Sequence, residues 1–371
     1  MKFALFLGNA GHSSGGPEVY EVELVRALAR LESEDHFHLM CLFPGARKLL
    51  GALPENFTCH TLRPSVRAVS MTVTLPWMLS RIQPQAVHST FMAPPLVLQP
   101  HLLTLVCLSM FERPDFYPPA VRLRLQALTK SGLKRSQHVL CVSETLRDCA
   151  VEMFQIPSER ISVVPLGVHP RFREYPPAVV RTYLDAQGIR QPYFLFSGRW
   201  ERRKNLLGAI EAFALFKRET RLPHKLVLSG KRTWIETEVM RRIADLELQD
   251  EVIDHGKTPL DELPLLYAGA TALVYASFYE SFGFPILEAM ACGAPVITSN
   301  VTAMPETAGG AAILVDPYKP ALIAEAMHNV ATNAELAADR TSAGLRRAAN
   351  FAWEKTAQAS LEAYRRAAIT N

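Results

Sequence analysis

Short apolar segments alternate with helix-like segments along most of this chain, and this alternation limits the possible folds more than any other feature. Such alternation is typical of parallel sheets whose strands are joined by crossover helices. In the first half, strands are predicted near 2–8, 36–43, 85–88, 102–108, 137–142 and 161–164, and helices near 18–31, 120–134 and 143–154. In the second half, strands are predicted near 193–197, 224–229, 251–254, 271–276, 294–298 and 312–315, and helices near 203–220, 234–246, 259–268, 283–293, 319–333 and 335–349. The sequence therefore predicts an α/β protein with two doubly wound, Rossmann-like domains.

A proline-rich stretch from Val164 to Pro177 separates the two halves. A chain of 371 residues exceeds the size at which a single core stops growing. We therefore place the domain boundary near residue 170, with one domain at 1–170, a second at 171–352, and a cleft suited to two substrates between them. A last helix, about 353–371, is longer than the second domain needs.

The composition narrows the class of protein. Apolar residues make up 49% and charged residues 20%, and no uninterrupted apolar run is long enough to span a membrane. The net charge of +4 is far from the basic blocks of nucleic-acid-binding proteins. The six cysteines form no C-x-x-C pair, which favours reduced thiols. We expect a cytoplasmic protein that does not bind nucleic acid.

The segment from Tyr279 to Met290 carries the clearest chemistry. Glu280 and Glu288 flank a Gly-Phe-Pro turn, with a helix-forming run behind it. Gly283 allows an unusual backbone conformation and Pro285 suits a first helical turn, so backbone N–H groups from Ser281 to Phe284 can point at a phosphate. The motif indicates a sugar-nucleotide site; the alternative is two ordinary carboxylates that complement a helix dipole.

A second cluster follows the predicted strand at 193–197. Arg199 and Lys204 come after the strand's C-terminal end, where open α/β sheets bind ligands, and can hold a diphosphate without a metal. We expect Arg202 and Arg203 to face solvent. The chain contains no D-x-D sequence, and His36 and His38 are interpreted as surface residues of a strand. We therefore assign no metal and no cofactor.

Two further features lie in the first half. Gly15 and Gly16 end a glycine-rich loop that runs from Gly8 into a helix; it fits neither G-x-G-x-x-G nor the P-loop pattern, so it is either a ligand loop or a structural turn. The predicted helix at 120–135 carries five cations. It is interpreted either as a solvated face or as a contact to anionic lipid or to a pyrophosphate-bearing acceptor.

Together these motifs resemble the retaining, nucleotide-sugar-dependent glycosyltransferases with the GT-B fold, of family 4 or the "glycosyl transferases group 1" type. The signature of that group is Glu, seven residues, then Glu, here Glu280 and Glu288. The resemblance covers nearly the whole chain. Other matching segments are 142–144, 164–168, 198–199, 203–205, 291–297, 304–306 and 314–317.

The resemblance implies a role for each candidate residue. Arg199 and Lys204 would neutralise the donor diphosphate, Glu280 would touch the donor sugar, and Glu288 would hold the ribose. The helix N-terminus would be supplied by Ser281, Phe282, Gly283 and Phe284, the base would lie near Gly256 and Lys257, and the N-terminal domain would take the acceptor, with Gly15, Gly16, His88 and Ser109 on that side. The final helix would cross back to the first domain.

One departure concerns the strand before the segment 113–118. Members of the group often carry His-Asp there, whereas Val106 and Cys107 occupy those positions in this chain. Valine cannot hydrogen-bond a sugar hydroxyl, although Ser109 or Glu112 could substitute. His88 is either a ligand contact or a core histidine.

The sequence thus predicts a retaining glycosyltransferase, a hexosyltransferase such as a mannosyltransferase, that uses GDP-mannose or a UDP-sugar in glycan or surface-polysaccharide biosynthesis. Its acceptor would be a saccharide or a lipid-linked saccharide. A catalytically impaired sugar-nucleotide-binding or scaffolding protein is an alternative. So are a phosphorylase, for which the chain is short, and an epimerase.

Overall fold

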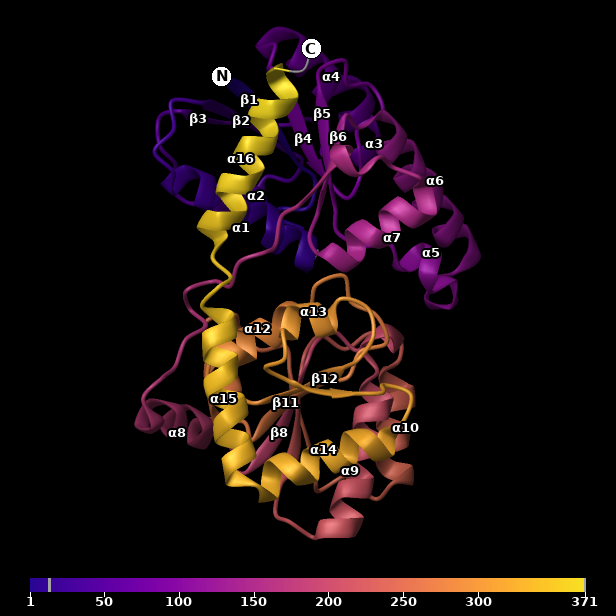
Figure 1. The fold of residues 1–371 in the computed structure, drawn as a ribbon, viewed down its shortest axis with the longest axis vertical. Helices are drawn as coiled ribbons and strands as arrows, with labels where there is room; N and C mark the ends of the chain where they lie inside the picture. The colour runs from indigo at the N-terminus through magenta and orange to yellow at the C-terminus, as the bar shows by residue number, and fades with distance from the viewer. Residues whose placement is uncertain (13–14, 370–371) are drawn as a thin grey trace. The chain divides into compact units, whose positions relative to one another are not determined.

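A computed structural model describes residues 1–12 and 15–369, which form two compact units (Figure 1). The first unit combines Met1–Gly167 with Ala352–Asn371, and the second is Val168–Phe351. Each unit contains one parallel sheet. The predicted pair of Rossmann-like domains is therefore confirmed. The first segment of the first unit ends at Gly167, three residues before the predicted boundary.

The first unit has a seven-stranded parallel sheet in the order β3-β2-β1-β4-β5-β6-β7. Its strands are β1 (Lys2–Leu7), β2 (His36–Cys41), β3 (Phe57–Thr61), β4 (Ala86–Thr90), β5 (His101–Leu105), β6 (His138–Cys141) and β7 (Ile161–Val163). Its helices are α1 (Gly16–Arg30), α2 (Gly45–Leu50), α3 (Arg67–Val69), η1 (Ser70–Thr74), α4 (Leu75–Ile82), α5 (Ser109–Glu112), η2 (Pro114–Phe116), α6 (Pro119–Arg135), α7 (Glu144–Phe154), η3 (Ser158–Arg160) and α16 (Trp353–Ile369).

The sequence did not predict β3 or the helical stretch from α3 to α4. β3 is a short edge strand with only Phe57 fully buried, so it lacks the apolar run that marks the central strands. The stretch from α3 to α4 contains β-branched residues and Pro76, which lower helix propensity. Its Met71, Leu75 and Leu79 nevertheless pack into the core with Phe6, because burial overrides propensity.

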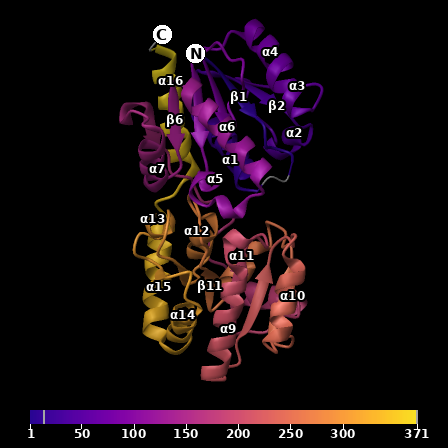
Figure 2. The same ribbon diagram turned by 90° about the vertical axis from the view of Figure 1, so that its right-hand side faces the viewer.

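The helices of the first unit cover the two faces of its sheet. α1 and α16 pack together on one face, while α3, α4 and α6 lie on the other (Figures 1 and 2). α16 is joined to this unit by specific contacts. The Thr356 hydroxyl donates to Pro165 O at 2.7 Å, and a Cβ on Gly167 would lie 2.2 Å from Trp353 N. The last helix therefore completes the first unit, as the resemblance implied.

The second unit has a six-stranded parallel sheet in the order β10-β9-β8-β11-β12-β13. Its strands are β8 (Tyr193–Ser197), β9 (Lys225–Ser229), β10 (Val252–Gly256), β11 (Ala272–Tyr275), β12 (Val296–Ser299) and β13 (Ile313–Val315). Its helices are α8 (Pro177–Ala186), η4 (Arg202–Lys204), α9 (Leu206–Thr220), α10 (Glu236–Asp245), α11 (Leu263–Gly269), α12 (Phe284–Ala291), α13 (Met304–Ala308), α14 (Pro320–Thr332) and α15 (Ala334–Ala348).

All six predicted strands of the second unit are present, and the apolar runs of the four inner strands β8, β9, β11 and β12 are buried. β8, for example, is buried at every position. α9 and α14 pack against each other, and Phe213 and Met327 belong to the same core cluster. The loops that follow β8 and β11 leave the same edge of the sheet, since both strands run parallel. That edge is where ligands of open α/β sheets bind.

Candidate active site

Glu280 lies at the centre of a buried ionic cluster in the second unit. Its Oε1 is 2.6 Å from Lys204 Nζ and its Oε2 is 2.8 Å from an Arg203 nitrogen. The Tyr275 hydroxyl donates to Oε1 at 2.9 Å. Lys204 and Arg203 come from the loop between β8 and α9, whereas Glu280 follows β11, so the fold unites residues about 76 positions apart.

The cluster keeps Glu280 ionised. Burial alone favours the neutral carboxyl, but the positive charges of Arg203 and Lys204 and the hydrogen bonds to Lys204 and Tyr275 outweigh it and lower the pKa of Glu280 to about 2. A carboxylate surrounded in this way is a fixed hydrogen-bond acceptor at physiological pH. It can accept from a hydroxyl group, but its proton affinity is too low for a general base.

Arg203 was predicted to face solvent, and that prediction is wrong. Besides its ion pair with Glu280, Arg203 donates to Tyr279 O at 2.9 Å and accepts the Phe278 N–H at its carbonyl oxygen, also at 2.9 Å. The adjacent Arg202 does face solvent and pairs with Glu238. Adjacent residues of η4 point about a third of a turn apart, so the two arginines face different surroundings, which a run of two arginines does not reveal.

Arg199 is, like Arg202, an exposed cation of this loop. Its side chain is 50% exposed, and its Nε lies 2.9 Å from Glu201. The backbone of the preceding residue, Gly198, lies directly against that of Gly230. A Cβ on Gly230 would be only 1.8 Å from Gly198 O. Close backbone contact therefore sets where the loop leaves β8, while the Arg199 side chain stays accessible to an anion.

The turn between the two glutamates has the predicted form. Gly283 has a φ of 97° and precedes α12, whose first two residues are Phe284 and Pro285. The Thr307 hydroxyl donates to Phe282 O at 2.5 Å, and Thr302 Oγ1 accepts the Glu280 N–H at 3.2 Å. These contacts fix the loop at the N-terminal end of α12, where the helix dipole favours a negative group.

Glu288 sits in a different environment from Glu280. Tyr267 donates to its Oε2 at 3.1 Å, and the Tyr267 oxygen is also 3.0 Å from Ser197 Oγ. Burial raises the pKa of Glu288 to about 7, because its partners only partly offset the loss of water. Near neutral pH this carboxyl can therefore either accept or donate a hydrogen bond.

Gly256 ends β10 beside the loop that carries the cations. Its φ is 71°, and its carbonyl oxygen accepts the Gly230 N–H at 2.8 Å. A Cβ at this position would meet nothing within 4 Å, so the space beside this backbone is open. The neighbouring Lys257 is exposed.

In the first unit, two carboxylates of α1 accept hydrogen bonds from backbone N–H groups of the glycine-rich loop. Glu21 accepts the N–H groups of Asn9 and Ala10, both at 2.8 Å, and Glu18 accepts the Gly11 N–H at 2.8 Å. Gly15, with a φ of 74°, caps α1, and Gly16 is its first residue. Two members of the predicted loop, Ser13 and Ser14, lie outside the described residues.

Two predicted residues of the first unit are buried. His88 Nε2 contacts Thr104 Oγ1 at 2.7 Å and its Nδ1 contacts the Tyr364 hydroxyl at 2.9 Å, and burial lowers its pKa to about 3. This matches the core-histidine interpretation. Ser109 is also buried, with Oγ 2.6 Å from the Tyr117 hydroxyl and 2.9 Å from Cys107 Sγ.

Several residues of these clusters were missed from the sequence: Tyr267, Tyr275, Glu18 and Glu21. The two tyrosines lie in apolar runs that predict only core packing. Glu21 carried a signal, since it lies in a helix between Tyr20 and Val22, among apolar positions. A carboxylate in such a place needs a partner.

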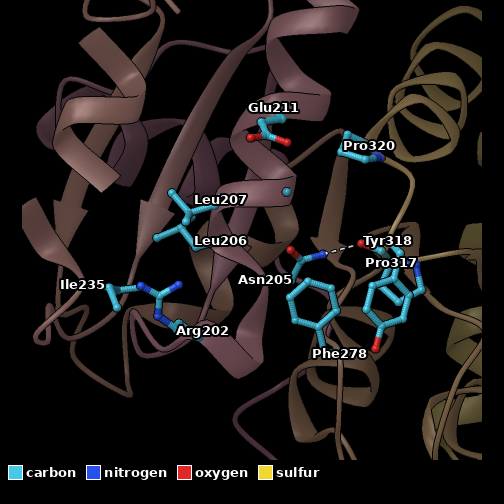
Figure 3. Close-up of a pocket in the computed structure, with 11 residues that line it drawn as sticks. Arg202, Asn205, Leu206, Leu207, Glu211, Ile235, Phe278, Pro317, Tyr318 and Pro320 are labelled. Atoms are coloured by element: carbon cyan, nitrogen blue, oxygen red, sulfur yellow. Dashed lines mark hydrogen bonds between the residues drawn. The ribbon is translucent and has the colours of Figure 1, made fainter. Parts of the chain in front are cut away.

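Figure 3 shows a pocket beside the start of α9 that contains none of the predicted site residues. Asn205 donates to Ala276 O and Pro317 O at its base, and the rings of Phe278 and Tyr318 stack with centroids 4.9 Å apart. Its charged members, Arg202 and Glu211, pair with residues of α10. We assign it no ligand.

Neither a metal cluster nor a membrane helix is found within the described part of the chain. No three His, Cys, Asp or Glu side chains among residues 1–12 and 15–369 are arranged to hold a metal ion. Within the same residues, no helix combines the length and the apolar character needed to cross a bilayer.

Two Rossmann-like units, the second with an ionic cluster at the carboxyl edge of its sheet, define a GT-B protein. The family model "Glycosyl transferases group 1" matches residues 184–347, and "Glycosyltransferase Family 4" matches residues 14–172. The Escherichia coli O-antigen chain mannosyltransferase B is 34% identical over 295 residues, which are 78% of this chain and 76% of that protein. The chain belongs to the GT-B glycosyltransferases of the group 1 type.

Solved structures show the same fold. Sucrose-phosphate synthase from Thermosynechococcus elongatus aligns with a TM-score of 0.81 and 20% identity, covering 100% of both chains. Anabaena HepE in complex with UDP-glucose aligns with a TM-score of 0.78 and 16% identity, covering 99% of this chain and 100% of the other. At these identities the likeness concerns the fold alone.

Proposed function

We propose that this glycosyltransferase moves a mannosyl group from a nucleotide-diphosphate donor to an acceptor hydroxyl in surface-polysaccharide biosynthesis, with retention at the anomeric carbon. The observation that carries the proposal is the Glu280 cluster, a permanent carboxylate beside cations at the carboxyl edge of β8 and β11. The mannosyl assignment is supported by the similarity to the O-antigen mannosyltransferase. GDP-mannose is the first donor to test and a UDP-sugar the second, since HepE was solved with UDP-glucose.

Each residue has a distinct task in this proposal. Glu280 accepts hydrogen bonds from hydroxyls of the donor sugar, and Glu288 binds the ribose diol. Arg199 and the N-terminal end of α12, with Ser281 to Phe284, neutralise the diphosphate. Lys204 has three N–H donors, of which Glu280 and Tyr275 use two. The third remains for a phosphate oxygen, without any need for a metal ion.

The chemistry is a front-face displacement. The bond from the anomeric carbon to the diphosphate oxygen breaks as the acceptor oxygen bonds to the same face of that carbon. The acceptor proton passes to the leaving phosphate oxygen. Fixed cations and helix dipoles stabilise the charge that builds up on that oxygen. Glu280 is not the nucleophile, because both of its oxygens are held by cations.

The donor and the mechanism are tested together. Purified protein is incubated with GDP-, UDP-, ADP- and dTDP-sugars in EDTA, without acceptor, and nucleotide release is measured against Glu280→Gln. Release from GDP-mannose that survives EDTA and falls about a hundredfold or more in the variant is expected. Release from another donor alone would overturn the mannosyl assignment, and loss of release in EDTA would overturn metal independence.

A second candidate function is a catalytically impaired sugar-nucleotide-binding protein, because Val106 and Cys107 occupy the usual His-Asp positions. Such a protein would be stabilised thermally by a nucleotide sugar, yet would release no nucleotide with any acceptor. Restoring the pair in a Val106→His, Cys107→Asp variant would then create turnover. If the unmodified protein turns over, this candidate is eliminated.

We also propose that the enzyme associates peripherally with the inner face of the cytoplasmic membrane through α6, where a lipid-linked saccharide acceptor would be available. Arg122, Arg124, Lys130, Lys134 and Arg135 give this helix five cations, and it contains no Asp or Glu. Each cation near an anionic bilayer contributes about 1 kcal/mol to binding.

A further inference from the structure

One face of the first unit exposes an unusual row of large apolar side chains. Val69, Val73 and Trp77 are spaced by four residues along the helical stretch from α3 to α4, so they form a single stripe, and the exposed Val66 immediately precedes that stretch. Val73 is 61% exposed and Trp77 is 54% exposed. The opposite side of the same stretch, with Met71, Leu75 and Leu79, is buried in the core. The stripe is therefore the side of this stretch that faces away from the core.

The loop between β4 and β5 extends this apolar surface toward α6. Its Met92 and Val97 pack against the core cluster beneath α4, and its Ala93 contacts Gly132 of α6. Leu98, on the same loop, is 97% exposed. α3, α4 and α6 line one face of the sheet (Figures 1 and 2), and this loop packs against α4 and α6. We call this surface the stripe face.

Charge distinguishes the stripe face from ordinary surface. From Asn56 to Phe111 the sequence contains no Asp or Glu, and the exposed cations Arg63 and Arg81 flank the stripe. The Arg81 guanidinium lies 4.2 Å from the centre of the Trp77 ring. Tryptophan and arginine together suit the boundary between headgroups and acyl chains, where an aromatic ring inserts and a cation meets phosphate.

We propose that the stripe face inserts into the interface of a bilayer that contains anionic phospholipid, with Val69, Val73 and Trp77 as the inserting side chains. This inference rests on the peripheral contact proposed for α6 and adds to it an apolar anchor on a different element. An acid-free surface repels neither headgroup phosphate nor a lipid-linked acceptor. A second copy of the chain would present the same cations, so like charges would oppose that contact.

The first test is vesicle sedimentation with the full chain. Phosphatidylcholine vesicles are compared with vesicles in which about one third of the lipid is phosphatidylglycerol. The Val73→Ser, Trp77→Ser variant should bind the anionic vesicles about tenfold or more weakly, because two apolar anchors are lost. The matched control is Val179→Ser, Trp234→Ser, which removes an exposed valine and an exposed tryptophan of the second unit and should bind as the unmodified protein does.

A charge variant separates this inference from the α6 contact. Arg124→Gln, Lys134→Gln should weaken binding to anionic vesicles and leave binding to neutral vesicles unchanged. If the stripe variant binds normally while the charge variant does not, the apolar anchor is wrong and the α6 contact stands. If the unmodified protein binds neither kind of vesicle, the apolar anchor and the α6 contact are both wrong. The glycosyltransferase proposal is tested separately, by transfer to a water-soluble acceptor.

A spectroscopic readout covers the case in which the double variant fails to fold. Trp200 and Trp353 are fully buried, so Trp77 and Trp234 dominate any change in the exposed-tryptophan fluorescence. Anionic vesicles should shift the emission to the blue, and Trp77→Phe should abolish that shift while Trp234→Phe keeps it. The reverse pattern would overturn the proposal. So would a change of oligomeric state in Val73→Ser, Trp77→Ser without vesicles, since the stripe would then be a contact between copies.

Discussion

Each of the two units buries a glutamate against its first strand-to-helix loop. The pKa values of these two carboxyl groups are shifted in opposite directions. Glu21 in the first unit meets neutral N–H donors from Asn9 and Ala10, and burial raises its pKa to about 7. Glu280 in the second unit is equally buried, yet Arg203 and Lys204 lower its pKa to about 2. Burial alone therefore does not decide the charge of a carboxyl group; the formal charge of its partners does.

The largest effect is expected from removing the cations around Glu280. In Arg203→Met, Lys204→Met the carboxylate stays buried without a countercharge, which should destabilise the second unit by about 3–5 kcal/mol. Hydrogen exchange of α9 and α12, followed by mass spectrometry, measures the loss. Adding Glu280→Gln should restore part of it. Arg202→Met, which removes an exposed ion pair, should cost less than about 1 kcal/mol.

The next effect concerns pH and Glu21. Its native pKa lies above the unfolded value of 4.5, so the native state holds the proton more tightly between those values. Stability of the first unit should therefore fall by about 3 kcal/mol as the pH rises from about 4.5 to about 7. Hydrogen exchange of α1, corrected for intrinsic rates, measures this. Glu21→Gln should remove most of that slope; an unchanged slope would show that Glu21 does not titrate there. Glu280 has the opposite sign, so its stabilisation is lost only below about pH 4.5.

A smaller effect tests Arg67, a cation near Glu21. Arg67 lowers the pKa of Glu21 slightly and donates to Gly8 O from the same side chain. Arg67→Met should raise the pKa of Glu21 further, moving the upper end of the pH slope to higher pH, and should cost about 1 kcal/mol for the lost hydrogen bond. Arg63→Met removes an exposed cation instead. This control variant should change neither the pKa of Glu21 nor the stability of the first unit.

The smallest effect on stability is expected at Arg199, where the side chain is half exposed. Arg199→Gln should change the unfolding free energy by less than about 0.5 kcal/mol, because only a surface pair with Glu201 is lost. Turnover should nevertheless fall about a hundredfold, since this cation is available to the leaving diphosphate. Steady-state kinetics with GDP-mannose measures the loss of turnover, which distinguishes it from the small loss of stability. Full turnover in this variant would remove the electrostatic basis of the proposed mechanism.

The sequence predicted the second unit well because its strands are buried apolar runs and its glycine and proline residues mark the turn before α12. It failed where the outcome depends on tertiary contacts. β3 is a polar edge strand, and α4 is helical only because Leu75 and Leu79 are buried. At the candidate site, the residue types at 199, 204, 280 and 288 are visible in the sequence. The pairing of Arg203 with Glu280 is not, since it depends on how one helical turn orients two adjacent arginines.

The return of α16 to the first sheet has a consequence for synthesis on the ribosome. Strands β1 to β7 emerge before the second unit, whereas the helix that packs on α1 and hydrogen-bonds His88 through Tyr364 emerges after it. The whole of Val168–Phe351 is made in between, which at about 5–20 residues per second takes roughly 10–40 s. Throughout that interval the nascent first unit displays the apolar face that Trp353 and Leu361 later cover, and so offers a binding site to chaperones.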